Sequence, residues 1–582
     1  MPTPRNRSVP APAPGRLSLA ALLASALALA ASSTGCGDDA ADDTAGAGAS
    51  SSGASGSGAS GSGASSSGGG GAGGSAPSCP TDVEAEAGTA ITELGAARAT
   101  AAGATWAWKG IPFAAPPVGD LRWQPPAPAA CFDGVLEAAA FGPVCPQFEG
   151  NGVGAILGDE DCLTLNVWAP AEPAEAALPV MVWIHGGGHV QGSASAAAAG
   201  TDLYDAQRLV ERTGVVVVTL QYRLGPLGWL AHPSLAAESE VGTTGMYGHL
   251  DQVAALEWVQ RNIAAFGGDA SRVTLFGESA GGVSVCTLLA SPLAAGLFSG
   301  AIMQSGGCVA MPLEDAEDFG GEVFDDAGCG DAAEPAACMR GLSTADVLSA
   351  KPVVIDVAGA LSGYGAVIDG HAVLDRPLDV IASGAHNAVP FLVGANSDET
   401  SRSTPLPQTA TEAQYEAAVT TLLGALAAPA LEQYPAADYA SPWAAYVALT
   451  SDAKFICSAR RAARAALEGQ TEPVRLYHLS HGVEGSPTLA PFGAWHGVDV
   501  LYLFDHLDIG GYTPTAAESA VSAAMIDRWA SFAATGDPDA SGATPAWPLY
   551  DLDDAYLGFD DPVIAGTGIR SAQCDFWDSL SL

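Results

Sequence analysis

The chain has 582 residues, and its 64 Asp and Glu residues against 22 Lys and Arg residues give a formal net charge of −42 at pH 7. This charge argues against nucleic acids and anionic lipid surfaces as partners, because contacts to phosphate groups need a basic patch. It favours solubility and says nothing about the fold.

The N-terminus is typical of an export signal. Three arginines precede an apolar stretch over 17–31, which is shorter than the ~20 residues of a comfortable membrane span and fits a signal peptide. The small residues that follow end at Cys36 and resemble the cleavage box of bacterial lipoproteins, with Ser33 where that box usually has Leu. We expect 1–36 to be a signal peptide and Cys36 to carry a lipid anchor in the cell envelope. Soluble secretion is the alternative.

A linker is expected at 37–78. This segment contains almost only Gly, Ala and Ser with a few Asp residues, and it cannot bury enough apolar surface to offset chain entropy. No second break of this composition follows. Although about 500 residues exceed the usual size of one core, we expect 79–582 to form a single domain.

Short apolar runs separated by helix-length segments predict an α/β protein. The pattern favours a doubly wound, mostly parallel central sheet with helices on both faces. Two segments rich in Ala, Leu and acidic residues, 308–386 and 410–469, are expected to form a helical cap over the pocket. The expected strands are 180–184, 215–220, 273–276, 301–303 and 391–393.

A Gly-x-Ser-x-Gly motif places Ser279 between an expected strand and an expected helix. Flanking glycines suit a turn this tight, because a Cβ atom at either place would clash. The helix N-terminus favours developing negative charge near the hydroxyl. Ser279 is therefore a candidate nucleophile, although in a chain with 71 glycines the motif alone also arises by chance.

A serine nucleophile needs oxyanion donors, a base and an acid that orients the base. His185 and three glycines follow the strand that ends at Ile184, and bare backbone N–H groups there suit an oxyanion loop; a plain flexible loop is the alternative. Asp398 and Glu399 follow a later strand, and His496 lies further on in a Gly-x-x-His-Gly context. The order serine, acid, histidine is that of the α/β-hydrolases.

Together these motifs resemble the type-B carboxylesterase family, the cholinesterase-like branch of the α/β-hydrolase fold. The resemblance extends from about Cys79 to the C-terminus. Further segments that carry it are 108–114, 116–123, 160–167, 222–225, 266–269 and 573–577.

The resemblance implies a serine esterase that works through an acyl-enzyme intermediate. Ser279 is then the nucleophile, His496 the base and Glu399 the acid, because the family places its acid second in the Asp-Glu pair; Asp398 is the rival. The implied oxyanion donors are the backbone N–H groups of Gly187, Gly188 and Ala280. No metal or organic cofactor is expected, since zinc-ligand spacings and a phosphate-binding glycine motif are absent.

Other polar residues have weaker assignments. Glu278 resembles a family carboxylate that tunes the electrostatics of the site, with a structural salt link as the alternative. His185 is expected to brace the oxyanion loop. His189 stands where that loop usually ends in a bulky aromatic residue, which predicts an atypical pocket mouth. His478 and His481 are expected at the surface or at a strand end.

Eleven cysteines indicate an oxidising compartment. If Cys36 is lipidated, ten remain. Cys79 and Cys131 are candidates for a further bridge, Cys286 is interpreted as a small buried hydrophobic residue, and Cys308 is expected near the floor of the site. The family resemblance implies three pairs, namely Cys145 with Cys162, Cys329 with Cys338, and Cys457 with Cys574.

The sequence narrows the substrate only to a small-molecule ester. The loop between Cys145 and Cys162 has no tryptophan, and 400–403 is polar where choline-binding relatives carry aromatic residues, so choline esters are not expected. The leading hypothesis is a carboxylesterase for short or medium acyl chains. A long-chain lipase of the same family and a catalytically silent adhesion module are the alternatives. The physiological ester and the oligomeric state stay open.

Overall fold

The computed structural model describes Cys79, 86–150, 152, 154–172, 177–355, 357 and 363–580. The expected signal peptide, the lipidation at Cys36 and the linker lie outside these residues. Within them, no helix has the length and apolar character needed to cross a membrane.

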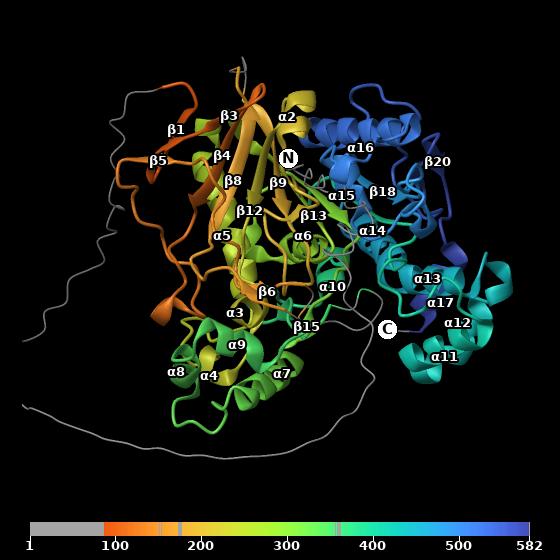
Figure 1. Cartoon of the computed structure of the whole chain (residues 1–582), viewed down its shortest axis with the longest axis horizontal. Coiled ribbons are helices and arrows are strands. Elements are labelled where there is room, and N and C mark those ends of the chain that lie inside the picture. Colours follow the sequence, from red (N-terminus) through yellow and green to blue (C-terminus); the bar gives the residue numbers. More distant parts are fainter. Residues whose placement is uncertain are drawn as a thin grey trace, which may run out of the picture. The chain divides into compact units, whose positions relative to one another are not determined.

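An eleven-stranded sheet forms the centre of the domain (Figure 1). The seven strands from β12 to β19 in the spatial order β12-β9-β13-β14-β17-β18-β19 are all parallel, while β8, β4 and β3 at one edge and β20 at the other are antiparallel. The strands are β3 (Thr100–Ala102), β4 (Thr105–Pro112), β8 (Thr164–Pro170), β9 (Leu178–Ile184), β12 (Val216–Leu220), β13 (Gly268–Glu278), β14 (Gly300–Gln304), β17 (Phe391–Asn396), β18 (Val474–Leu479), β19 (Tyr556–Phe559) and β20 (Ile564–Gly566).

Two apolar cores lie on opposite faces of this sheet. In β9, Val180 and Val182 belong to one core, whereas Met181 and Trp183 belong to the other, because successive side chains of a strand point to opposite faces. The first core is covered by α5 (Tyr247–Asn262), α6 (Ala280–Ala290), α10 (Pro377–Ala382) and α14 (Cys457–Gly469). The second is covered by α2 (Gln207–Thr213), α15 (Val498–Leu503) and α16 (Ala516–Thr535). The predicted doubly wound α/β fold is confirmed.

Every strand that the sequence predicted is present, but β18 and β19 in the parallel part of the sheet, and the antiparallel strands β3, β4, β8 and β20, were not predicted. Arg475 and His478 interrupt the apolar run of β18, and Gly558 lies within the four residues of β19. Arg475 is accommodated because its guanidinium reaches Asp537 at 2.9 Å. A continuous apolar run is the sequence signal of a buried parallel strand, and a strand that contains a paired charge lacks it.

The two segments expected to form a cap are helical, but they gather in two separate groups in Figure 1. One group, in green, comprises α7 (Leu313–Asp326), α8 (Pro335–Arg340) and α9 (Thr344–Ala350). The other comprises α11 (Glu412–Leu423), α12 (Ala427–Gln433) and α13 (Pro442–Ser451) with the C-terminal α17 (Ser571–Ser579). The second group has its own small core around Tyr415, Tyr434 and Trp577.

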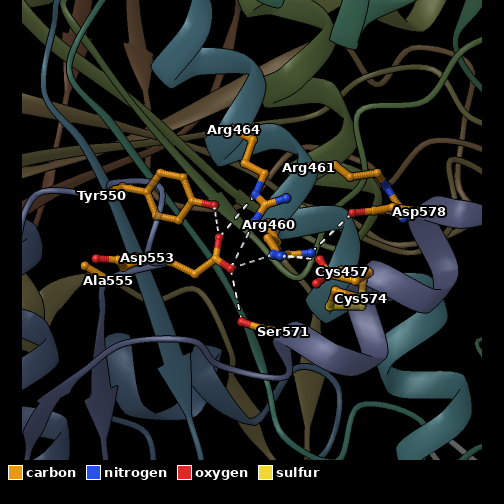
Figure 2. A network of polar contacts seen from close by, with 12 residues as sticks. Cys457, Arg460, Arg461, Arg464, Tyr550, Asp553, Ala555, Ser571, Cys574 and Asp578 are labelled. Atoms are coloured by element: carbon orange, nitrogen blue, oxygen red, sulfur yellow. Dashed lines mark hydrogen bonds and ion pairs between the residues drawn. A yellow bond between two sulfur atoms is a disulfide. The ribbon is translucent and has the colours of Figure 1, made fainter. Parts of the chain in front are cut away.

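Helix α17 is fastened to α14 by a disulfide bond and a network of ion pairs (Figure 2). Arg460 in α14 is 2% exposed and contacts Asp554 at 2.9 Å, Asp575 at 2.6 Å and Asp578 at 3.2 Å. Arg464 shares the carboxylate of Asp554 at 3.1 Å. A buried guanidinium surrounded by carboxylates is strongly destabilised if its partners are removed, so this network fixes the end of the described chain to the sheet.

Five disulfide bonds occur among the described cysteines. Four of them join the pairs implied by the family resemblance and the candidate pair of Cys79 with Cys131. The fifth joins Cys286 in α6 to Cys308 after β14. Cys286 is buried but bonded to Cys308, which corrects its interpretation from the sequence as a small hydrophobic residue. This number of disulfides is typical of proteins that fold outside the cytosol.

Smaller elements complete the described chain. They are β1 (Thr89–Thr92), β2 (Gly95–Arg98) and β5 (Val135–Glu137) in one sheet, the pairs β6 (Gln147–Phe148) with β7 (Ile156–Leu157), β10 (Ala197–Ala198) with β11 (Thr201–Asp202) and β15 (Met311–Pro312) with β16 (Val367–Ile368), and the short helices α3 (Gly225–Trp229) and α4 (Pro233–Ala236).

Candidate active site

Ser279 occupies a sharp turn between β13 and α6. Its backbone has φ 59° and ψ −123°, a conformation that a residue with a Cβ atom rarely adopts. A Cβ atom on Gly281 would lie 2.0 Å from the carbonyl oxygen of Ile184, so only glycine allows the helix to start this close to β9. The Ser279 side chain is partly exposed. The predicted strand–serine–helix arrangement is therefore present.

The glycine loop lies directly against this turn. Gly277 in β13 pairs with Ile184 in β9, so the chain segments after the two parallel strands leave the sheet at the same edge. A Cβ atom on Gly186 would approach the Cβ atom of Ser279 to 2.9 Å. Gly187 and Gly188 have φ values of 113° and 64°, which favour glycine. The loop that carries them therefore passes beside the Ser279 side chain at Gly186.

His185, the residue before the glycine loop, is held by contacts that fix the start of this loop. It is fully buried, its Nδ1 atom lies 2.9 Å from the carbonyl oxygen of Gly186, and its ring stacks on Tyr222 with centroids 4.4 Å apart. The hydroxyl of Tyr222 donates to the carbonyl oxygen of His185 at 2.8 Å. Burial lowers the pKa of His185 to about 4, so the ring is neutral at pH 7. These contacts fit the bracing role expected from the sequence.

Three other histidines were singled out in the sequence. His189 is buried, with its ring 4.3 Å from that of Trp229, so it does not line the mouth of the site. His478 lies within β18, and burial lowers its pKa to about 4. His481 follows β18 and is buried, with its Nδ1 atom 2.9 Å from Asp560. Both therefore lie at the end of a strand, one of the two positions expected for them.

His496 and Glu399 form a close pair. The Nδ1 atom of His496 lies 2.6 Å from Oε2 of Glu399, which is fully buried. The other carboxylate oxygen of Glu399 accepts the backbone N–H of Asn396 at 2.8 Å. The backbone N–H of His496 also donates to the carbonyl oxygen of Glu399 at 3.1 Å. Both the position and the orientation of the imidazole are therefore fixed by the loop after β17.

Asp398, the alternative acid, contacts other groups than His496. Its carboxylate accepts the backbone N–H of Ala494 at 3.2 Å and the hydroxyl of Ser397. Among the described residues it makes no hydrogen bond or ion pair with His496. Asp398 instead holds the loop that leads to His496.

The Nε2 atom of His496 faces a second carboxylate. It lies 3.2 Å from Oε1 of Glu278, the residue before Ser279. No hydrogen bond joins His496 to the Ser279 hydroxyl, although both are described; catalytic hydrogen bonds of this kind often tighten only when substrate is bound. Burial by itself lowers the pKa of His496, but the charges of Glu278 and Glu399 outweigh it and raise that pKa to about 9. Burial also raises the pKa of Glu278.

A buried polar network fixes the segment that carries His496. Asp499 in α15 accepts from Gln304 Nε2 at 2.7 Å and from Asn396 Nδ2 at 3.2 Å. The indole N–H of Trp529 donates to the amide oxygen of Gln304 at 3.2 Å. We did not predict these residues. The available signal was the spacing of Asp499, which follows His496 by three residues, but Gln304 and Trp529 come from distant elements.

The imidazole also has an aromatic neighbour. The ring of Phe455 lies 4.7 Å from that of His496 and comes from a π-helical turn, Asp452–Ile456, between α13 and α14. Such turns are frequent at functional sites. Among the described residues, no group of three or more His, Cys, Asp and Glu side chains is arranged to hold a metal ion.

An open, doubly wound sheet with a serine at the strand–helix turn and a histidine–carboxylate pair beside it defines an α/β-hydrolase. The sequence model of the carboxylesterase family matches residues 92–577, and the chain belongs to this family. It is an ester hydrolase.

Individual relatives agree with this assignment. The chain is 36% identical over 476 residues to the fumonisin B1 esterase of Sphingopyxis macrogoltabida, covering 79% of this chain and 84% of the relative. It is 34% identical over 476 residues to the para-nitrobenzyl esterase of Bacillus subtilis (strain 168), covering 79% and 92%. A solved structure of a PNB esterase aligns with a TM-score of 0.71 and 33% identity over 84% of this chain and 100% of that chain.

Proposed function

We propose that Ser279, His496 and Glu399 are the catalytic triad of this esterase. The observation that carries the proposal is the 2.6 Å contact between His496 and the buried carboxylate of Glu399, next to a serine at a strained turn. His496 accepts the Ser279 proton as the hydroxyl attacks the ester carbonyl, and Glu399 stabilises the resulting imidazolium. His496 then protonates the leaving alcohol, and water repeats the cycle on the acyl-enzyme.

The oxyanion formed in each step is assigned to the backbone N–H groups of Gly187, Gly188 and Ala280. Support comes from the glycine loop, whose backbone passes beside Ser279, and from the position of Ala280 at the first turn of α6. Donors held in place before the reaction stabilise the developing charge without reorganisation. Loss of one such donor lowers the rate by about 10²–10³-fold in a comparable site.

For the substrate we propose esters with short or medium acyl chains. A relative from Anas platyrhynchos named as a medium-chain fatty acyl-CoA hydrolase, 32% identical over 514 residues, supports the medium acyl chain. A long-chain lipase remains the second candidate within the same family.

The test is hydrolysis of p-nitrophenyl esters from acetate to palmitate by the wild-type chain and by Ser279→Ala. Serine-dependent turnover that peaks at short acyl chains supports the proposal, and a peak at palmitate with activation at an oil–water interface supports the lipase. A folded protein that shows no serine-dependent turnover and no labelling by an organophosphate supports the silent adhesion module instead.

We also place the enzyme in the cell envelope, anchored through a lipid on Cys36. The apolar segment and the box ending at Cys36 support this location. Mass spectrometry of the mature N-terminus tests it: a diacylglyceryl-modified Cys36 is expected, and a free N-terminus beyond Cys36 in the medium would indicate soluble secretion.

A further inference from the structure

Arg402 differs from the other arginines that the structure describes. Each of the others has a carboxylate oxygen within 4.0 Å of its guanidinium group. Arg402 has no such ion pair and no hydrogen bond to any residue that the structure describes. In a chain with 64 acidic and 22 basic residues, the absence of a counter-charge at this one position calls for an explanation.

The position of Arg402 links it to the catalytic machinery. It follows Glu399 by three residues, and its guanidinium carbon lies 5.3 Å from the ring centroid of Trp495, the residue before His496. The ring of Phe492 lies 5.8 Å away on the same loop. The hydroxyl of Ser401 donates to the carbonyl oxygen of Phe492 at 2.7 Å, which joins the two loops. The charge therefore lies where the loop carrying the acid meets the loop carrying the base.

The two aromatic rings hold the guanidinium without neutralising it. Their faces attract a cation, but they accept none of its five N–H donors in the plane of the group. The side chain is partly buried, and this loss of hydration lowers the pKa of Arg402, although the group stays protonated at neutral pH. A planar carboxylate that enters from solvent would accept two of the unused donors at once.

We infer that Arg402 binds a free carboxylate group of the substrate, so that the enzyme prefers esters of dicarboxylic acids that retain one ionised carboxylate. This inference rests on the proposed function, because it assigns a specificity contact to the same site. The net charge of −42 repels anions at a distance, yet at physiological ionic strength such repulsion is screened beyond about 8 Å. A local contact to Arg402 then decides which esters are bound productively.

Matched ester pairs test the inference. Monobutyl succinate, glutarate and adipate are compared with butyl butanoate, pentanoate and hexanoate, in which a methyl group replaces the carboxylate. Release of butanol gives kcat/KM for each ester at one fixed ionic strength. For the wild type, at least one hemi-ester is expected to react faster than its neutral partner.

The decisive variant is Arg402→Met, which keeps the length of the side chain and removes the charge. It should lower kcat/KM for the preferred hemi-ester by about 10- to 100-fold, the usual effect of losing a hydrogen bond to a charged group, and leave the neutral partner within about twofold. Arg402→Lys should keep part of the preference. Arg376→Met removes an exposed arginine that pairs with Asp379 at 3.7 Å and should change neither ester.

Three results would overturn the inference. The first is a wild type without preference for any hemi-ester. The second is an equal loss on both esters of a pair in Arg402→Met, which would show that Arg402 only supports the His496 loop. If Arg402→Met folds poorly, the wild type is tested with free glutarate, which should inhibit the hydrolysis of butyl pentanoate competitively. A lack of competition is the third contrary result. Failure of the proposed function itself would appear differently, as an absence of serine-dependent hydrolysis of the neutral esters as well.

Discussion

The carboxylate of Glu278 lies 3.2 Å from the Nε2 atom of His496, on the nitrogen that must exchange a proton with the nucleophile. Because Glu399 contacts the Nδ1 atom, both nitrogen atoms of the ring face a carboxylate. The charge of Glu399, and that of Glu278 where it is ionised, stabilise the imidazolium and disfavour the neutral ring; burial raises the pKa of Glu278 to about 8, so its charge acts fully only in the alkaline range. The site therefore favours the imidazolium form of His496. The neutral imidazole, which acts as the base, becomes abundant only at alkaline pH.

This arrangement predicts the pH dependence of the reaction. A general base must be neutral, and the pKa of His496 is raised to about 9, so kcat/KM for a neutral ester should rise with pH through the alkaline range. Glu278→Gln removes one charge that stabilises the imidazolium, which lowers the pKa of His496. The ascending part of the pH–rate profile should then move to lower pH, and profiles from pH 6 to 10 measure the shift.

A surface variant provides the control for that profile. Glu257→Gln removes the same charge from a helix position whose side chain is 52% exposed, and its profile should match that of the wild type. An ascending limb at the same pH in Glu278→Gln would show that Glu278 does not set the protonation of His496.

The adjacent carboxylates Asp398 and Glu399 give a second prediction. Glu399→Gln leaves the shape of the side chain but cannot stabilise the imidazolium, so kcat should fall by about 10⁴-fold, as in the corresponding change of a serine protease. Asp398→Asn should lower kcat by less than about tenfold, because its carboxylate contacts Ala494 and Ser397 rather than the ring. Steady-state kinetics on one neutral ester compares them, and a larger loss in Asp398→Asn would reverse the assignment.

Local motifs explain why parts of this protein could be predicted from its sequence. The turn at Ser279 is specified by residues within three positions of it, and apolar runs between helix-length segments specify the parallel strands. The pairing of Cys286 with Cys308 could not be found in this way, because spacing alone does not fix disulfide connectivity. The lack of a counter-charge at Arg402 is also invisible in sequence, since it depends on which acidic side chains of distant segments come near.

The bond between Cys286 and Cys308 should stabilise the domain. It connects the helix that begins after Ser279 to the segment after β14, with 22 residues between the two cysteines in sequence. Cys286→Ala with Cys308→Ala should lower the free energy of unfolding by about 3 kcal/mol, because closing a loop of this length restricts the unfolded chain. The urea midpoint measures the loss under non-reducing conditions.

The pair Cys329 and Cys338 serves as the comparison for that measurement. This bond closes a separation of 9 residues, so its double alanine variant should lose somewhat less stability, about 2.5 kcal/mol, if chain entropy dominates. A negligible loss in the Cys286 and Cys308 variant would mean that the packing of α6 against β14 is sufficient without the covalent bond.

The last prediction concerns the glycine loop and uses a pair of glycines with similar backbone conformations. Gly188 and Gly200 have φ values of 64° and 82°, so alanine is strained at both. A Cβ atom on Gly188 would also lie 3.0 Å from Cγ1 of Ile355, whereas one on Gly200 would meet nothing within 4 Å. Because Gly188 carries a proposed oxyanion donor, and alanine there is both strained and crowded by Ile355, Gly188→Ala should lower kcat by about 10²-fold or more.

Gly200→Ala isolates the effect of backbone strain, since Gly200 lies between β10 and β11, outside the glycine loop. It should lose about 1 kcal/mol of stability and keep its kcat. Equal kcat values in the two variants, measured on one neutral ester at saturating concentration, would remove Gly188 from the oxyanion site. If both variants lose the same thermal stability but only Gly188→Ala loses kcat, the loss of kcat comes from the displaced N–H group of residue 188 and not from backbone strain.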